Sequence, residues 1–170
     1  MAELQQINRR DPRPITISAP RPTLWLPPVQ GCAKVNMDAS VSRGGRYGAV
    51  GAICRDQTGL FLGASAIVFR HINDPQTLES LAIREALSLA DDLYVHSIHV
   101  ASDCKTVVED IKSGTSAVYG AVIHEIIEHS SGFQLCKIVH EFRSLNFEAH
   151  SLAKHPLSLW GGRHVWLGHP

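Results

Sequence analysis

The chain has 170 residues, a length typical of one domain, and 44% of them are hydrophobic, which is enough for a sizeable core. Its 16 Lys and Arg residues balance its 16 Asp and Glu residues, so the formal net charge is zero. Tight nucleic-acid binders are usually basic, because neutralising phosphates supplies much of their affinity. Any binding to nucleic acid is therefore expected either to be weak and local or to depend on another module.

Membrane and secreted classes are disfavoured. No apolar run reaches the ~20 residues that a membrane span needs, and residues 1–10 lack the apolar stretch of a secretory signal. No two cysteines have C-x-x-C spacing, which argues against a zinc ribbon. We therefore expect buried or free thiols in a reducing, intracellular compartment. The cysteines are Cys32, Cys54, Cys104 and Cys136.

Residues 1–28 are predicted to be a proline-rich tail or linker. They contain six of the nine prolines, and such a segment cannot form a helix or a central strand. The group Arg9, Arg10 and Arg13 is either a weak nuclear or organelle address or part of a solvated tail. We expect the compact domain to occupy residues 29–158 and a C-terminal tail without a clear period to occupy residues 159–170.

The domain is predicted to begin with three strands. Residues 34–40 alternate, with Val35 and Met37 on one side and Asn36 and Asp38 on the other, which is strand periodicity. Residues 47–55 and 60–69 form the next two strands. Short turns at Gly44-Gly45 and at residues 56–59 join the three, so they should form an antiparallel meander.

Helices and further strands follow the meander. Asp74-Pro75 provides an N-cap and a first-turn proline for a long helix that runs through Tyr94. The later predicted elements are a strand at 97–101, a short helix ending at residue 114, a helix at 119–130, a strand at 133–142 and a last helix from about 146 to before 156. This order implies a mixed sheet with helices packed on it.

Four polar residues lie at the ends of these elements. Asp38 is on the polar face of the first strand, Glu79 in the first turn of the long helix, Asp103 just after a strand and His150 in the first turn of the last helix. If the ends converge, three carboxylates and an imidazole can hold divalent cations. Each residue also has an ordinary structural explanation, as a solvated strand residue, a helix-dipole partner, an N-cap or a surface histidine.

Several segments together resemble ribonuclease H type 1, and most closely its plant reverse-transcriptase-like branch, found in retroelement-derived reading frames. The segments are Asp38-Ala39-Ser40, Glu79-Ser80-Leu81-Ala82, Ser102-Asp103-Cys104 and Arg143-x-x-Asn146-x-x-Ala149-His150-x-Leu152-Ala153-Lys154, with the lead-in Trp25-x-Pro27-Pro28-x-x-Gly31-x-x-Lys34-Val35-Asn36. The resemblance covers roughly residues 25–158. It implies an α/β, ribonuclease-H-like fold, in which a mixed five-stranded sheet combines the antiparallel meander with parallel strands.

The resemblance also implies a metal-dependent endonuclease that uses Mg²⁺ or Mn²⁺ to cleave the RNA strand of RNA–DNA hybrids. Asp38, Glu79 and Asp103 match the central metal-binding carboxylates of the family. His150 falls where many members have a fourth carboxylate. Because imidazole is a softer ligand than carboxylate, this departure favours manganese over magnesium.

The resemblance also implies contacts with the 2′-hydroxyl groups of the hybrid. They are expected from the backbone around Ala39 and Ser40 and from the turn before the long helix, near Asn73 to Thr77. A rival interpretation is a non-catalytic nucleic-acid-binding or interaction module that has kept the fold of a retroelement nuclease. The three carboxylates favour the enzyme, whereas His150 and the neutral charge favour the rival.

Overall fold

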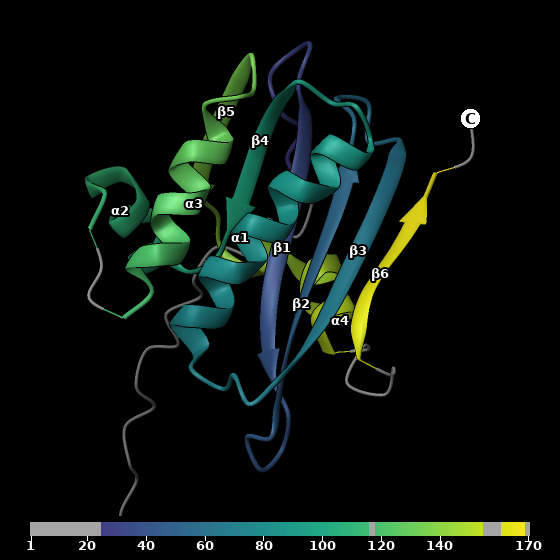
Figure 1. Cartoon of the computed structure of the whole chain (residues 1–170). Helices are drawn as coiled ribbons and strands as arrows, with labels where there is room; N and C mark the ends of the chain where they lie inside the picture. The colour runs from purple at the N-terminus through teal and green to yellow at the C-terminus, as the bar shows by residue number, and fades with distance from the viewer. Residues whose placement is uncertain (1–24, 116–117, 155–160, 169–170) are drawn as a thin grey trace, which may run out of the picture.

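The computed structural model describes residues 25–115, 118–154 and 161–168 (Figure 1). Most of the expected proline-rich tail, including Arg9, Arg10 and Arg13, lies outside the described residues, and so does the end of the expected last helix beyond residue 154. In the described part of the chain, none of the helices has the length and hydropathy needed to span a membrane.

One mixed sheet organises the molecule, with the strand order β5-β4-β1-β2-β3-β6. Its strands are β1 (Ala33–Val41), β2 (Tyr47–Arg55), β3 (Phe61–Arg70), β4 (Ser97–Ser102), β5 (Leu135–His140) and β6 (Gly162–Leu167). The helices are α1 (Pro75–Asp92), α2 (Lys105–Ser113), α3 (Gly120–Ser130) and α4 (Phe147–Lys154), with a 3-10 turn η1 (Arg143–Leu145) before α4. Strands β1, β2 and β3 form the expected antiparallel meander, and β4 and β5 join β1 in parallel.

The sheet has six strands rather than the five expected, because part of the presumed C-terminal tail forms β6. This strand pairs antiparallel with β3, placing Leu167 opposite Gly63. Most of its side chains are exposed, so its sequence lacks the apolar alternation that marks a half-buried strand. Arg163 ties β6 to α1 through ion pairs with Glu85 at 2.8 Å and Asp92 at 2.6 Å.

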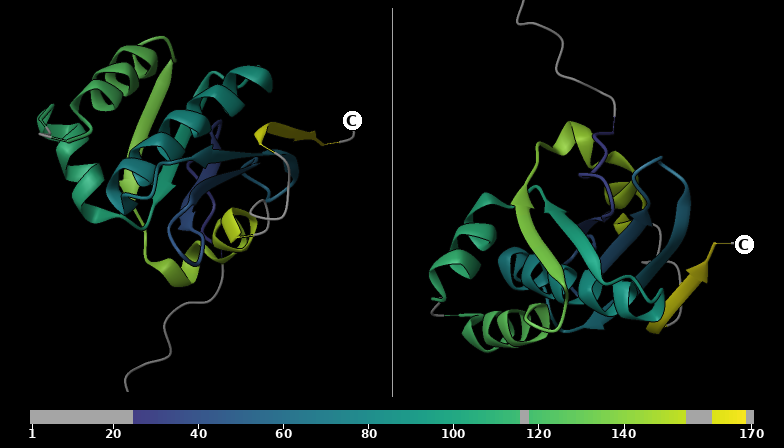
Figure 2. Two further views of the ribbon diagram at one scale, coloured as in Figure 1. Left: turned by 60° about the horizontal axis from the view of Figure 1, so that its bottom comes forward. Right: turned by 90° about the horizontal axis from the view of Figure 1, so that it is seen from above.

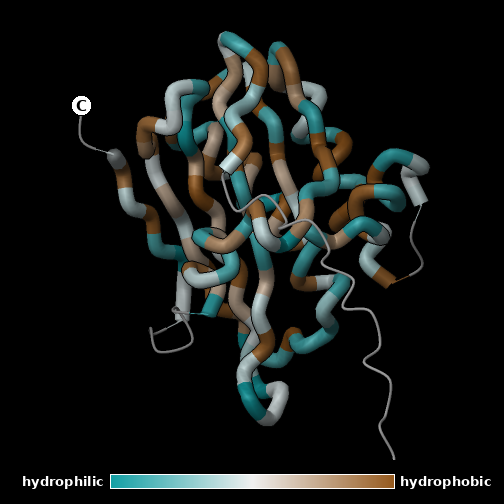
Figure 3. The backbone as a smooth tube through the Cα atoms, turned by 180° about the vertical axis from the view of Figure 1, so that it is seen from behind, coloured by the Kyte–Doolittle hydropathy of each residue, from teal (hydrophilic) through white to brown (hydrophobic). Residues whose placement is uncertain are grey.

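Helices cover both faces of the sheet. α1 lies across one face beside α2 and α3, and α4 packs against β1 and β2 on the other (Figure 2). Val35 and Met37 of β1 are fully buried beneath α1, as their alternation predicts. Hydrophilic and hydrophobic residues follow one another along the strands when the sheet is seen from the α4 side (Figure 3).

Two glycines of β2 allow this close packing. A Cβ atom at Gly48 would lie 2.4 Å from the side chain of Leu78 in α1, and one at Gly51 would lie 2.9 Å from the backbone nitrogen of Ala153 in α4. Gly51 is also the antiparallel neighbour of Asp38. The small residues of β2 therefore allow α4 to approach the sheet directly beside the strand that carries Asp38.

The start of α1 follows its sequence signal. The side chain of Asp74 accepts a hydrogen bond from the backbone N–H of Thr77 at 2.8 Å, and Pro75 occupies the first helical position. The helix ends at Asp92, two residues before its expected end.

All four cysteines are free thiols, and burial raises the pKa of Cys54 to about 12.

Candidate metal centre

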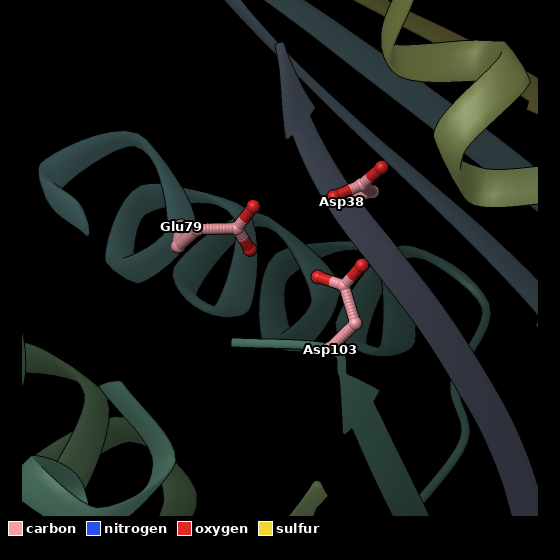
Figure 4. A group of neighbouring side chains, drawn as sticks. All are labelled: Asp38, Glu79 and Asp103. Atoms are coloured by element: carbon pink, nitrogen blue, oxygen red, sulfur yellow. The ribbon is translucent and has the colours of Figure 1, made fainter. Parts of the chain in front are cut away.

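Asp38, Glu79 and Asp103 converge at one edge of the sheet. Each offers a carboxylate oxygen, and these oxygens lie within 4.8 Å of one another. The parallel pairing of β1 with β4 places Asn36 opposite Ala101, so Asp38 and Asp103, each two residues further on, end up side by side. α1 begins at the same edge and contributes Glu79, and the three carboxyl groups point toward one another (Figure 4).

Burial and mutual repulsion perturb the protonation of this group. The pKa of Glu79 is raised to about 9, chiefly by burial and then by the negative charges of Asp38 and Asp103, and a hydrogen bond from the backbone N–H of Ala39 offsets part of this rise. The pKa of Asp103 is also raised, by burial and by Asp38, while the nearby charge of Arg143 opposes the shift. Without a counter-ion the cluster therefore retains a proton.

The donor set fits a hard divalent cation. Glu79 Oε2 is buried and has no hydrogen-bond partner among the described residues. A buried acceptor without a partner carries a free-energy cost that ligation would relieve. Magnesium and manganese favour carboxylate oxygens, and magnesium usually takes only a few of them. The three carboxylates are thus suited to such an ion in both charge and chemistry.

His150 contacts this cluster from α4. Its Nδ1 lies 2.5 Å from Asp38 Oδ2 and 3.2 Å from Arg143 Nη2. A carboxylate only accepts hydrogen bonds and a guanidinium only donates them, so Nδ1 cannot bond to both. The shorter contact favours an Nδ1–H that donates to Asp38, and Arg143 is then only in close contact with the ring. Among the described residues, the group of closely spaced ligand atoms contains the three carboxylates and not His150. The contact with Asp38 is established, whereas a metal-binding role for His150 remains a prediction.

A cleft of about 650 Å³ opens over the carboxylates. Ala39 and Ser40 line it, as expected for residues that follow Asp38 on β1. Phe142 and Arg143 line it too, and Arg143 Nε lies 3.7 Å from Asp103 Oδ2. Sequence reasoning gave Phe142 no role in the site, because it lies at the end of the predicted strand 133–142. In the structure β5 ends at His140 and Phe142 is exposed before η1.

Asn73 and Thr77 do not line the cleft, and their side chains form hydrogen bonds with residues outside it. The side-chain amide of Asn73 donates to the carbonyl of Gly45 at 3.0 Å, bridging to the β1–β2 turn. The hydroxyl of Thr77 donates to Asp74 at 2.6 Å, within the cap of α1. Their predicted contacts with a hybrid would require these polar groups to exchange partners.

A family model described as reverse transcriptase-like matches residues 36–156. The chain is also 27% identical over 144 residues to a provisionally named ribonuclease H protein of Arabidopsis thaliana. That match covers 82% of the chain but only 23% of the relative, so the chain spans about a quarter of the relative's length.

Solved structures share the fold. RNase H1 from the archaeon Halobacterium salinarum superposes with a TM-score of 0.63 at 21% identity, covering 74% of this chain and 96% of that one. LC11-RNase H1, isolated from compost and solved in complex with an RNA/DNA hybrid, gives a TM-score of 0.60 at 18% identity, covering 71% and 92%. The fold is therefore ribonuclease-H-like.

Proposed function

The chain belongs to the reverse transcriptase-like family, and we propose that it is a metal-dependent endonuclease that cleaves the RNA strand of RNA–DNA hybrids. The convergence of Asp38, Glu79 and Asp103 from three separate elements at one sheet edge carries the proposal. A purely structural domain gains nothing from three carboxylates that repel one another in a partly buried cleft. The match to a provisionally named ribonuclease H protein supports the same reaction class.

The three carboxylates and His150 have different roles in this proposal. Asp38, Glu79 and Asp103 would hold Mg²⁺ or Mn²⁺, and Glu79 would give up its retained proton on binding. When bound, such ions activate water and stabilise the leaving oxygen of a phosphodiester. His150 holds Asp38 through its Nδ1–H, and at the position where many family members have a fourth carboxylate it would also offer a nitrogen ligand.

Substrate contacts would come from the rim of the cleft. Ala39 and Ser40 line the cleft beside Asp38 and are proposed to contact 2′-hydroxyl groups, the feature that distinguishes RNA from DNA. Asn73 and Thr77 are retained as predicted contacts at the turn before α1. Arg143 extends into the opening with a largely exposed side chain and offers a positive charge to a phosphate.

Cleavage assays on defined duplexes test the proposal. Hybrid, double-stranded DNA and double-stranded RNA would be incubated with the full chain and with Mg²⁺ or Mn²⁺, beside Asp103→Asn as the control for contaminating nuclease. We expect products from the hybrid's RNA strand only, and none from the variant. A wild-type chain that binds hybrid but cleaves it with neither metal would instead support the non-catalytic module, which the neutral charge and His150 favour.

A further inference from the structure

Alternate residues of β1 are paired one by one with the segment that leads into α4. Lys34, Asn36 and Asp38 share one face of the strand, and their exposed fractions are only 2%, 6% and 2%. Each meets a polar partner from residues 141–150, and we call these three pairs the polar ladder. Its pairs are Lys34 with Glu141, Asn36 with Asn146 and Asp38 with His150.

The middle pair of the polar ladder is bonded to the backbone on both sides. Asn146 is fully buried, and its side-chain oxygen accepts from Asn36 Nδ2 at 3.0 Å. Its side-chain nitrogen donates to the carbonyl of Met37 at 2.7 Å, and its own carbonyl accepts from the backbone N–H of His150 at 3.1 Å. Asn146 thus connects the residue before Asp38 to the turn of α4 that carries His150.

The outer pair connects the ladder to β4 and to the lead-in segment. Lys34 donates to Glu141 and also to the carbonyl of Leu26 at 2.7 Å. The backbone N–H of Glu141 donates to the carbonyl of Ser102 at 2.8 Å, next to Asp103. Trp25 completes the outer end, because its indole N–H donates to Asn36 Oδ1 at 2.9 Å and Lys34 Nζ lies 5.5 Å from its ring.

Outside the polar ladder, the buried contact between α4 and the sheet gives little directional information. It is made by small residues, since Ala149 and Ala153 are buried and the backbone at Ala153 passes over Gly51. The other polar link, between Glu148 of α4 and Arg55 of β2 at 2.9 Å, is solvent-exposed. Apolar packing of small side chains does not depend on direction, whereas hydrogen bonds require defined distances and angles. A buried ion pair such as Lys34–Glu141 is also a poor source of stability compared with apolar residues, and its best-attested use is to fix register.

We propose that Lys34, Glu141, Asn36 and Asn146 are positioning residues that set the contact between Asp38 and His150. Their hydrogen bonds fix the register of α4 along β1, so that the imidazole meets the carboxylate at the cleft. The importance of that contact for cleavage rests on the function proposed above. The contact itself can be measured without metal or substrate, because the hydrogen bond of a histidine ring selects its tautomer.

The experiment compares folding stability with the tautomer of His150 in the full, metal-free chain. Ring ¹⁵N shifts would be recorded at alkaline pH and assigned by their loss in His150→Gln. The variants are Lys34→Met, Glu141→Gln and the double variant that carries both. Lys34→Arg keeps the ion pair with Glu141. Glu148→Gln is the matched control, because Glu148 lies on α4 and its exposed ion pair with Arg55 of β2 is outside the polar ladder.

The double variant separates positioning from stability. Each single change leaves a buried charge unpaired and should destabilise the fold, whereas the double variant removes both charges and should recover most of the stability. We expect the double variant still to lose the single Nδ1–H state of His150, and Lys34→Arg and Glu148→Gln to keep it. The kcat of the double variant on hybrid should fall about 10- to 100-fold with little change in KM, as expected for a misplaced group.

Two other outcomes have separate meanings. A native His150 tautomer in the double variant would overturn the positioning role, whatever the cleavage rate. A tautomer that responds as expected in a chain that cleaves no hybrid would support the positioning role and overturn the proposed function instead.

Discussion

The imidazole of His150 lies 2.5 Å from a carboxylate oxygen of Asp38, although 112 positions separate the two residues. His150 stands where many family members have an acidic residue. This departure from the family pattern is therefore in direct contact with one of the candidate metal ligands. A neutral ring with one N–H holds Asp38 through Nδ1 and leaves Nε2 with a lone pair. The chemistry of the cleft therefore depends on what His150 does there.

Replacing His150 with Asp should change metal preference. In the wild type we expect Mn²⁺ to support cleavage better than Mg²⁺, because nitrogen is a poorer partner for the harder ion. Only neutral imidazole ligates, so protonation of the ring at acidic pH would remove this ligand and lower activity. His150→Asp should shift preference toward Mg²⁺ and move the acid limb to lower pH. Identical metal and pH profiles for both proteins would remove His150 from the metal site.

Neutralising any of the three carboxylates should abolish cleavage and leave the fold intact. Asp38→Asn, Glu79→Gln and Asp103→Asn each remove a ligand charge, and we expect kcat to fall by at least about 100-fold. Glu109→Gln is the control, because that glutamate is exposed on α2 and pairs only with Lys105. Circular dichroism would check folding, and wild-type cleavage by one of the three variants would exclude that residue from the site.

The raised pKa of Glu79 predicts that the metal-free protein loses stability as pH rises. The folded state holds a proton up to about pH 9 that the unfolded state releases near pH 4.5, so this stabilisation is present below pH 4.5 and disappears as pH rises through about 9. One pKa unit corresponds to about 1.4 kcal/mol. We expect Glu79→Gln to be more stable than the wild type by about 1–3 kcal/mol at pH 9.

Urea unfolding in EDTA at pH 6 and pH 9 measures this difference. The gain from Glu79→Gln should shrink at pH 6, where the wild-type carboxyl is still protonated. Added Mg²⁺ should stabilise the wild type more at pH 9 than at pH 6, since it competes with the proton. Equal stabilities of wild type and variant at both pH values would contradict the electrostatic strain inferred for the cluster.

Binding to the hybrid should be weak, because the chain has no net positive charge. It should fall steeply with salt, because the affinity that remains depends on local contacts with phosphates. Of the four basic residues nearest the site in sequence, Arg43, Arg46, Lys105 and Arg143, only Arg143 lines the cleft. We expect Arg143→Gln to lower affinity and to reduce the salt slope by about one. Lys105→Gln should change the affinity and the salt slope less than Arg143→Gln does. Fluorescence anisotropy with catalytically inactive Asp103→Asn backgrounds measures this, and tight, salt-insensitive binding would refute it.

Removing Arg163 should loosen β6 without affecting the cleft. Glu85 is 4% exposed and would lose its cationic partner, so we expect Arg163→Ala to lower the free energy of unfolding by about 1–3 kcal/mol. Arg84→Ala removes an exposed pair with Glu125 and should cost less than about 1 kcal/mol. Hydrogen exchange of the β3 and β6 amides would report the loosening. Unchanged protection there would show that the strand ladder alone holds β6.

The sequence by itself determined the local elements and the candidate residues of the site. Alternation in residues 34–40 predicted β1 with Val35 and Met37 inward, and Asp74-Pro75 predicted the start of α1, because these patterns depend on neighbours within a few residues. The order of elements implied a mixed sheet. The family motifs identified Asp38, Glu79 and Asp103 as partners, and the fold brings them within 4.8 Å.

Only the tertiary structure decided what each polar face meets. Alternation placed Lys34 and Asn36 opposite the core, but periodicity does not reveal that residues 141–150 cover them and pair with them. β6 was not predicted from the sequence, because the groups that stabilise it are remote in sequence. They are the backbone of β3 and the acidic residues of α1. Backbone periodicity is set by local geometry, whereas the pairing of buried polar groups is set by which distant surface excludes water from them.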